Sequence, residues 1–241
     1  MRNTTLVREL LRPIPGLQAV SRSLSRRAFG GSCKFWEERY ANGGTSGPGS
    51  YGSLAQAKAE FLNTFVREHG VRSVTEFGCG DGHQLASAHY PSYVGLDVSS
   101  AAVRICKRRF ADDPSKSFFL YDGECFADPV GVFRADLVLS LDVIYHLVEN
   151  KIFETHMRHI FDSASRYVVV YSTNSELIDG APHVRHRAFT PWVEANAPEW
   201  RLARTVRGPN TESRRADFFV FELTGGQGGT GERGGHRWLR A

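Results

Sequence analysis

Long apolar runs are missing from this chain, in which no segment approaches the ~20 apolar residues that a membrane-spanning helix needs. Cysteine is scarce as well, with four residues at positions 33, 79, 106 and 125. They form no C-x-x-C pair and have no histidine at metal-ligand spacing, so the sequence predicts neither a zinc site nor a disulfide framework. This cysteine usage favours a reduced, cytoplasmic setting.

A strong charge of one sign is also lacking, because the net charge is only +4. The 25 arginines and five lysines are scattered and do not gather with aromatic residues as in RNA-binding domains, so nucleic acid is not an expected partner. A chain of 241 residues with 41% hydrophobic residues can form one α/β domain with additions. Two full domains are not expected.

The two ends of the chain differ in composition from its middle. Residues 1–30 hold six arginines against the single acid Glu9, which fits either a targeting segment or a basic arm lying on the domain. We favour the arm, because Pro13 and Pro15 interrupt any long amphipathic helix, and we expect at most a peripheral membrane contact through it. Residues 225–235 contain seven glycines and predict a disordered tail. The expected organisation is an arm and possible lid at 1–52, a main domain at 53–224 and a tail at 225–241.

The most informative motif is VTEFGCGDGHQL, Val74–Leu85, where an apolar run containing Glu76 opens into glycines at 78, 80 and 82. Such a loop brings bare backbone against a ligand, because glycine has no side chain to block close approach. A second apolar run, Tyr93–Leu96, stops at Asp97, where a carboxylate can accept hydrogen bonds from ribose hydroxyls. The two junctions together predict a nucleoside site.

Two further strand ends carry acids. The run Ser117–Tyr121 is closed by Asp122 and Gly123, and the run that opens at Asp136 ends near Asp142. Because this last run is apolar without alternation, it predicts a central parallel strand that is buried on both faces. The alternatives are an ordinary Asp-Gly turn for Asp122 and a helix N-cap for Asp142.

The string E-x-G-x-G-x-G, followed in order by Asp97 and Asp122, resembles the motifs of the class I S-adenosylmethionine (SAM) dependent methyltransferases. The resemblance covers residues 71–172. It implies SAM as the cofactor, with its amino-acid end on the glycine loop, its ribose at Asp97 and its adenine amine at Asp122. The cofactor-binding residues that it implies are Glu76, Gly78, Cys79, Gly80, Asp97, Val98, Asp122, Gly123, Leu141 and Asp142.

Helices and strands alternate along the middle of the chain, which predicts parallel pairing and right-handed crossovers. Together with the resemblance this predicts an α/β fold, a three-layer Rossmann-like sandwich with a mostly parallel seven-stranded sheet, one antiparallel strand and an N-terminal helical arm. We expect strands at 71–77, 94–96, 118–121, 137–141 and 167–171, and a closing hairpin at 201–206 and 217–223. The expected helices are 53–68 capped by Ser53, one beginning at 84–88, 100–110 capped by Ser99 or Ser100, 150–164, and a short one starting near Thr190.

His146 is the candidate catalytic base, because it follows the fourth strand at the ligand-facing edge of the sheet and histidine titrates near neutrality. The alternative is a structural histidine that packs or caps the next helix. The polar residues at 183–187 in the segment 181–192 are expected to hold the acceptor, although a solvated basic loop fits the same pattern. A glycine-rich segment at 35–52 is expected to form a mobile lid, and aromatic packing of Trp36 and Tyr40 is the alternative. The candidate substrate-binding residues are Tyr51, Tyr145, His183, Arg185 and His186.

These features predict a methyltransferase acting on a small hydroxylated acceptor, namely a sugar, a glycoconjugate or a secondary metabolite. O-methylation is preferred, because no N/D-P-P-Y/F/W string of nucleobase amine methyltransferases follows the fourth strand, and no acidic cluster predicts a metal. The alternatives are N-methylation of a small amine or a protein side chain, and a SAM-binding partner subunit without turnover. A nicotinamide-dependent oxidoreductase is disfavoured, because His83 stands where the third glycine of G-x-G-x-x-G would fall and Tyr-x-x-x-Lys is absent.

Overall fold

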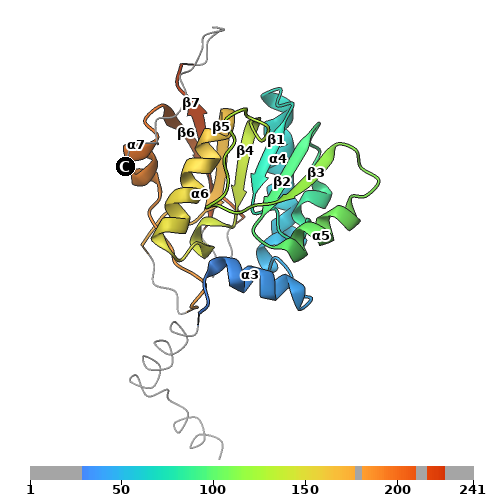
Figure 1. The fold of residues 1–241 in the computed structure, drawn as a ribbon. Helices are drawn as coiled ribbons and strands as arrows, with labels where there is room; N and C mark the ends of the chain where they lie inside the picture. Colours follow the sequence, from blue (N-terminus) through green and yellow to red (C-terminus); the bar gives the residue numbers. More distant parts are fainter. Residues whose placement is uncertain (1–28, 177–180, 210–215, 226–241) are drawn as a thin grey trace, which may run out of the picture.

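The computed structural model describes residues 29–176, 181–209 and 216–225, which build one seven-stranded sheet covered by helices (Figure 1). The order of the strands across the sheet is β3-β2-β1-β4-β5-β7-β6. Strands β1 to β5 pair in parallel, whereas β7 runs antiparallel to both of its neighbours. The predicted Rossmann-like fold with one antiparallel strand is therefore confirmed. The strands are β1 Val74–Phe77, β2 Tyr93–Asp97, β3 Lys116–Leu120, β4 Ala135–Leu141, β5 Ala164–Ser172, β6 Trp200–Val206 and β7 Asp217–Leu223.

The order of the strands reverses between β1 and β4. Chain connections leave this point in opposite directions, because β1 pairs with β2 on one side and with β4 on the other. Open α/β sheets bind ligands in the crevice that such a reversal leaves at the carboxyl ends of the strands. The topology alone therefore places a crevice next to the glycine loop.

Helices cover the two faces of the sheet in two apolar clusters. One face packs against α4 and α5 through Leu62, Phe65 and Cys106, and the other packs against α6 and α7 through Met157 and Val193. Helix α3 lies across the end of the sheet at which β1, β2 and β4 finish (Figure 1). The α-helices are α3 Ser32–Ala41, α4 Gly52–Glu68, α5 Ser100–Arg109, α6 Asn150–Asp162 and α7 Thr190–Asn196, and the short 3-10 turns are η1 Pro48–Ser50, η2 Gln84–Ser87 and η3 Ile144–His146.

Strand β4 shows why its sequence is apolar throughout. Leu137 and Leu139 belong to the cluster under α4 and α5, whereas Val138 belongs to the cluster under α6 and α7. Ser140 follows Val138 onto the second face, and its hydroxyl lies 2.9 Å from Nε2 of the buried His156 on α6. Both faces of this strand are buried, as expected for the centre of a parallel sheet.

Local structure differs from the sequence prediction at two helix starts. The segment expected to begin a helix at 84–88 forms only the short turn η2, because the Asn63 side chain bonds the carbonyl of Ser87 and the amide of His89 and leads the chain into an extended path. Helix α4 begins at Gly52, one residue before the predicted cap Ser53, and no side chain caps it. Ser99 does cap α5, since its Oγ accepts the amide proton of Ala102.

Several expectations lie outside the described residues. The basic arm up to residue 28 and the glycine-rich tail from residue 226 are among them. In the part of the chain that the structure describes, no helix is both long and apolar enough to cross a bilayer.

The burial of β4 makes Leu139 a test of the core. Leu139 is 0% exposed, so Leu139→Ala removes packed methyl groups and leaves a cavity. We expect this change to lower the free energy of unfolding by about 2–5 kcal/mol, measured by urea denaturation. The matched control is Val130→Ala, at a side chain that is 87% exposed, with an expected change within about 0.5 kcal/mol. Equal effects of the two substitutions would contradict the assignment of β4 to the core.

Candidate functional site

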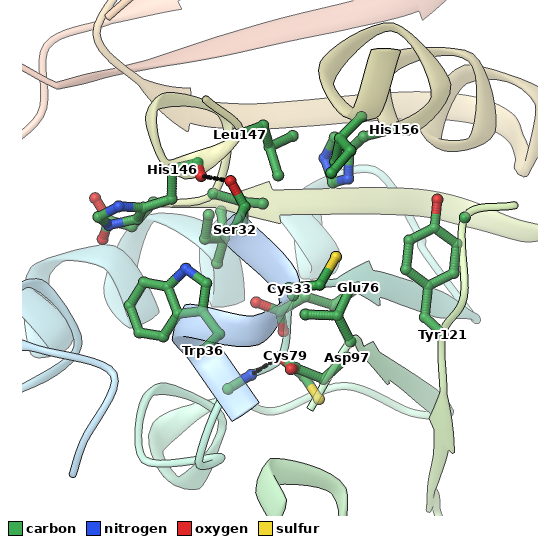
Figure 2. A pocket seen from close by; sticks show the side chains of 18 of the residues that line it. Ser32, Cys33, Trp36, Glu76, Cys79, Asp97, Tyr121, His146, Leu147 and His156 are labelled. Carbon is green, nitrogen blue, oxygen red and sulfur yellow. Dashed lines mark hydrogen bonds between the residues drawn. The ribbon is translucent and has the colours of Figure 1, made fainter. Parts of the chain in front are cut away.

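A cavity of about 310 Å³ opens where β1, β2 and β4 end, and α3 forms its opposite wall (Figure 2). All ten residues that the sequence assigns to cofactor binding line this cavity, and so does His146. The cavity thus joins four strand-end segments, around residues 76–80, 97–98, 122–123 and 141–146, that are far apart in the sequence. Further lining residues include Ser32, Cys33, Trp36, Lys58, Gln84, Tyr121, Thr155 and His156.

The glycine loop after β1 has backbone angles that other residues rarely adopt. Gly78 has φ 89°, and a Cβ atom on it would lie 2.4 Å from Cγ2 of Val143. Gly80 has φ 59°, and a Cβ atom there would lie 2.4 Å from Oγ of Ser46. The loop needs glycine at both positions because of its backbone angles and because other segments pack directly against it.

Glu76 lies at the bottom of the cavity. One of its oxygens accepts a 2.6 Å hydrogen bond from the hydroxyl of Tyr93, which is fully buried. Burial raises the pKa of the Glu76 carboxyl to about 7, although the Tyr93 hydrogen bond and the charge of Lys58 act in the opposite direction.

Asp97 connects the end of β2 to the glycine loop. Its Oδ2 accepts the amide proton of Gly80 at 2.8 Å, and its Oδ1 accepts that of Ser99 at 2.9 Å. Burial raises the pKa of this carboxyl to about 6, against the effect of the two backbone hydrogen bonds. The cavity therefore holds two buried carboxyl groups whose charge a cationic ligand would stabilise.

Asp142 follows β4 in a strained conformation. It has φ 59° and is the one non-glycine residue with positive φ in the described ranges. Its Oδ2 accepts a 2.6 Å hydrogen bond from Nζ of Lys58, and its Oδ1 accepts one of 2.6 Å from the hydroxyl of Tyr145. Strained residues persist where the surrounding contacts hold them, and they cluster at functional sites.

Lys58 is a site residue that the sequence analysis missed. It belongs to α4, where it lies one turn from both Leu54 and Leu62 in an apolar stripe of this helix. A lysine within such a stripe is the signal that could have identified it, because a buried lysine needs a partner.

His146 lies at the cavity wall on η3, opposite Trp36 of α3. The ring centroids of His146 and Trp36 are 4.9 Å apart in an edge-to-face arrangement. Nδ1 of His146 lies 3.0 Å from the carbonyl oxygen of His183, which can only accept, so Nδ1 carries the proton. Burial lowers the pKa of this imidazole to about 4, which leaves Nε2 unprotonated at neutral pH.

Helix α3 is attached to the cavity rim at its first residue. The hydroxyl of Ser32 lies 2.8 Å from the carbonyl oxygen of His146 and 2.6 Å from Oε2 of Glu149, while its amide donates to Oε1 of Glu149. At the other end of α3, the hydroxyl of Tyr40 lies 2.9 Å from Oγ of Ser46. Residues that the sequence assigns to a lid thus form one wall of the cavity, and their mobility stays a prediction.

The five residues predicted to contact the acceptor do not line the cavity. Tyr51 donates to Oδ2 of Asp81 and stacks on His83, with ring centroids 3.8 Å apart. Tyr145 points to Asp142, and the ring of His183 stacks on that of Phe35 at 4.3 Å.

The two remaining candidates are likewise held by the protein. Nη1 of Arg185 donates to the carbonyl of Val148, and Nδ1 of His186 lies 2.7 Å from Oγ1 of Thr173. In this structure each of the five side chains bonds or stacks with another residue of the protein. Their contact with an acceptor stays a prediction.

Comparison with known proteins agrees with this architecture. Residues 75–168 match the family model described as a methyltransferase domain, whereas no curated protein matches the sequence. The structure of the N-methyltransferase NodS from Bradyrhizobium japonicum WM9 in complex with S-adenosyl-L-homocysteine (SAH) is similar with a TM-score of 0.62 at 15% identity, over 80% of this chain and 98% of that chain.

Two other solved structures have similar folds. Magnesium protoporphyrin IX methyltransferase (ChlM) from Synechocystis PCC 6803 with bound SAH gives a TM-score of 0.57 at 15% identity, over 84% of this chain and 99% of that chain. The methyltransferase domain of bacterial CtHen1-C gives 0.57 at 18% identity, over 71% of this chain and 100% of that chain. At 15–18% identity, the structural similarity shows that these proteins share their fold with this chain.

The raised pKa of Glu76 predicts how stability depends on pH. A carboxyl with a higher pKa in the folded than in the unfolded chain stabilises the fold below its unfolded pKa, and this contribution is lost as pH rises through about 7. Because an amide does not titrate, Glu76→Gln is expected to flatten the fall in unfolding free energy between pH 4.5 and 7. Urea denaturation at several pH values measures this slope. Parallel profiles for the two proteins would contradict the burial of an ionisable carboxyl at this position.

Proposed function

We propose, for a chain that carries a methyltransferase domain in the class I fold, that the cavity binds SAM and that the protein transfers its methyl group to a small hydroxylated acceptor. The family match and the shared fold indicate a SAM-dependent methyltransferase. The observation that carries the proposal is the gathering of Glu76, Asp97 and the backbone of residues 78–80 in one cavity. The identity of the acceptor is the finer part of the proposal.

The residues present fit SAM in their chemistry. The two buried carboxyls can accept hydrogen bonds and face a positive charge, and the glycine loop offers backbone without side chains. Oε1 of Gln84 is buried at the cavity and has no hydrogen-bond partner in the described structure. A buried acceptor without a partner is costly unless a ligand supplies a donor.

When bound, SAM supplies a methyl group on a positively charged sulfur. In our proposal Asp97 holds the ribose hydroxyls, Asp122 the adenine amine and the glycine loop the amino-acid end. Hydrogen bonds from the backbone amides of Glu124 and Cys125 lower the pKa of Asp122 and keep it an acceptor. The protein then contributes by orienting the acceptor and excluding water, for which the wall formed by α3 is suited.

His146 is the proposed base for the acceptor hydroxyl. Its neutral ring has Nδ1 fixed on the carbonyl of His183, which orients Nε2 as the proton acceptor. The lowered pKa makes it a weak base but keeps it unprotonated through the whole neutral range. We infer O-methylation from this arrangement, which needs no charged group on the acceptor.

N-methylation is the second candidate and has one observation in its favour. Asp142 places a carboxylate on the cavity wall near His146, and a carboxylate can hold an ammonium group. NodS, which has the same fold, is named as an N-methyltransferase.

A cytoplasmic location and a small-molecule partner belong to the same proposal, and the four free cysteines support a reducing setting.

SAM binding is tested with a matched pair of aspartates. Asp97→Asn is expected to weaken binding of SAM and SAH at least about tenfold, because it replaces a charged acceptor inside the cavity. Asp128 also accepts two backbone amide protons, from Val132 and Phe133, but lies outside the cavity lining, so Asp128→Asn should bind like wild type. Calorimetry and a thermal-shift comparison with NAD give the readout. Stabilisation by NAD alone would overturn the proposal in favour of an oxidoreductase.

The role of His146 is tested by separating turnover from binding. His146→Ala is expected to lower kcat by about 10²–10⁴-fold, the usual contribution of a general base, while Kd for SAM changes less than about threefold. Transfer of labelled methyl from SAM to paired hydroxyl and amine acceptors measures turnover and distinguishes O- from N-methylation. The exposed His89→Ala serves as control. Equal losses of turnover and SAM affinity in His146→Ala would assign this histidine a structural role.

A further inference from the structure

The geometry points to a counter-ion exchange at Lys58, an inference that rests on the proposed function. We propose that Lys58 leaves Asp142 for the carboxylate of the cofactor's amino-acid group, so that Asp142 becomes able to bind the acceptor only after the cofactor is in place. This would make a single lysine responsible both for selecting a carboxylate-bearing cofactor and for the order of binding.

The buried ammonium group of Lys58 needs an anionic partner, but this partner can be a carboxylate other than that of Asp142. Its side chain is 1% exposed, its Nζ lies 2.6 Å from Oδ2 of Asp142, and Nζ lies 5.1 Å from the ring centroid of Tyr171. An ammonium group buried this deeply needs an opposite charge, because desolvation without one is very unfavourable. A second carboxylate at the same place satisfies Lys58 as well as the first does.

Asp142 is better placed than Lys58 to release the contact. Its side chain is 13% exposed, and its other oxygen keeps the 2.6 Å hydrogen bond from Tyr145. After the exchange this carboxylate still has one partner, and Oδ2 is available to a donor on the acceptor, whether a hydroxyl or an ammonium group. Asp142 follows the end of β4 with φ 59° and lines the cavity.

Gln84 is the second residue that we assign to the binding of the cofactor's amino-acid group. Its amide nitrogen donates to the carbonyl of Ala55 at 2.8 Å, which orients the amide and leaves Oε1 as the atom at the cavity. This oxygen is buried and without a partner in the described structure. Lys58 and Gln84 both line the cavity, which therefore has one cation and one unsatisfied acceptor in its lining. An α-amino acid group carries the matching pair, a carboxylate and an ammonium.

Glu76 is a second acid whose carboxyl interacts with the charge of Lys58. This carboxyl accepts a hydrogen bond from Tyr93, and burial raises its pKa to about 7. The ion pair of Lys58 is formed with Asp142, whose Oδ2 lies 2.6 Å from Nζ. The other lysine that lines the cavity, Lys151, pairs with Glu124. Asp97 accepts hydrogen bonds from the backbone amides of Gly80 and Ser99.

The test compares two ligands that share the adenosyl part but differ in the amino-acid group. SAH carries the carboxylate and the ammonium, whereas 5′-methylthioadenosine carries neither. Isothermal calorimetry on the full chain should show that Lys58→Met weakens SAH binding about 10- to 100-fold, the range for a lost charge-assisted hydrogen bond, and leaves the Kd for 5′-methylthioadenosine within about threefold.

Asp142→Asn is the decisive second variant. If Asp142 competes with the ligand for Lys58, its neutralisation should strengthen SAH binding about threefold or more and leave 5′-methylthioadenosine binding unchanged. Lys58→Met alone leaves a buried carboxylate without its partner and lowers stability, so the neutral double variant Lys58→Met/Asp142→Asn is measured beside it. The double variant should remain folded and bind SAH as weakly as Lys58→Met.

Three outcomes overturn the exchange. Equal weakening of both ligands in Lys58→Met assigns the lysine a structural role, and weaker SAH binding in Asp142→Asn makes Asp142 a direct cofactor ligand. SAH binding by the double variant at wild-type strength shows that Lys58 does not contact the carboxylate. Failure of the wild-type protein to bind either ligand would overturn the proposed function together with this inference, whereas normal wild-type binding with unresponsive variants removes the inference alone.

Discussion

Burial of carboxyl groups at the carboxyl ends of parallel strands is the constraint on which the rest of this structure depends. Asp97 ends β2, Glu76 is the last residue but one of the neighbouring strand β1, and both side chains are buried. Each must therefore be satisfied by protein donors, which are the hydroxyl of Tyr93 for Glu76 and the amides of Gly80 and Ser99 for Asp97. The glycine loop has its shape because the Gly80 amide must point back to Asp97.

The same constraint explains the wall on the far side of the cavity. Buried carboxyls keep raised pKa values only where water is excluded, and α3 provides this cover with Trp36 and Cys33. Ser32 attaches the helix to Glu149 and to the backbone of His146, so the cover is joined to the segment that carries the candidate base. The helix before the domain and the loop after β4 thus form one unit, although more than 100 residues separate them.

Aromatic and histidine contacts extend this unit away from the cavity. His183 lies between Phe35 of α3 and His146 of η3, with which its ring stacks at 4.3 Å and 5.6 Å. The loop around residue 183 accordingly supports the catalytic candidate through its backbone carbonyl and its ring. Two polar residues of this loop, Arg185 and His186, bond to Val148 and Thr173 of neighbouring segments.

The sequence by itself determined the fold and which acidic residues gather at one cavity. Strand-end acids and glycines are local signals, since a carboxylate directly after an apolar run stands at the strand end wherever that strand is placed, and parallel strands bring such ends to one edge of the sheet. Glu76, Asp97, Asp122 and Asp142 were identified in this way. Only the tertiary structure decided the pairing of Lys58 with Asp142, the wall formed by α3 and the supporting position of the loop around His183. These contacts join residues 84 to 148 positions apart, and no local pattern of residue types encodes which distant side chain satisfies a buried group.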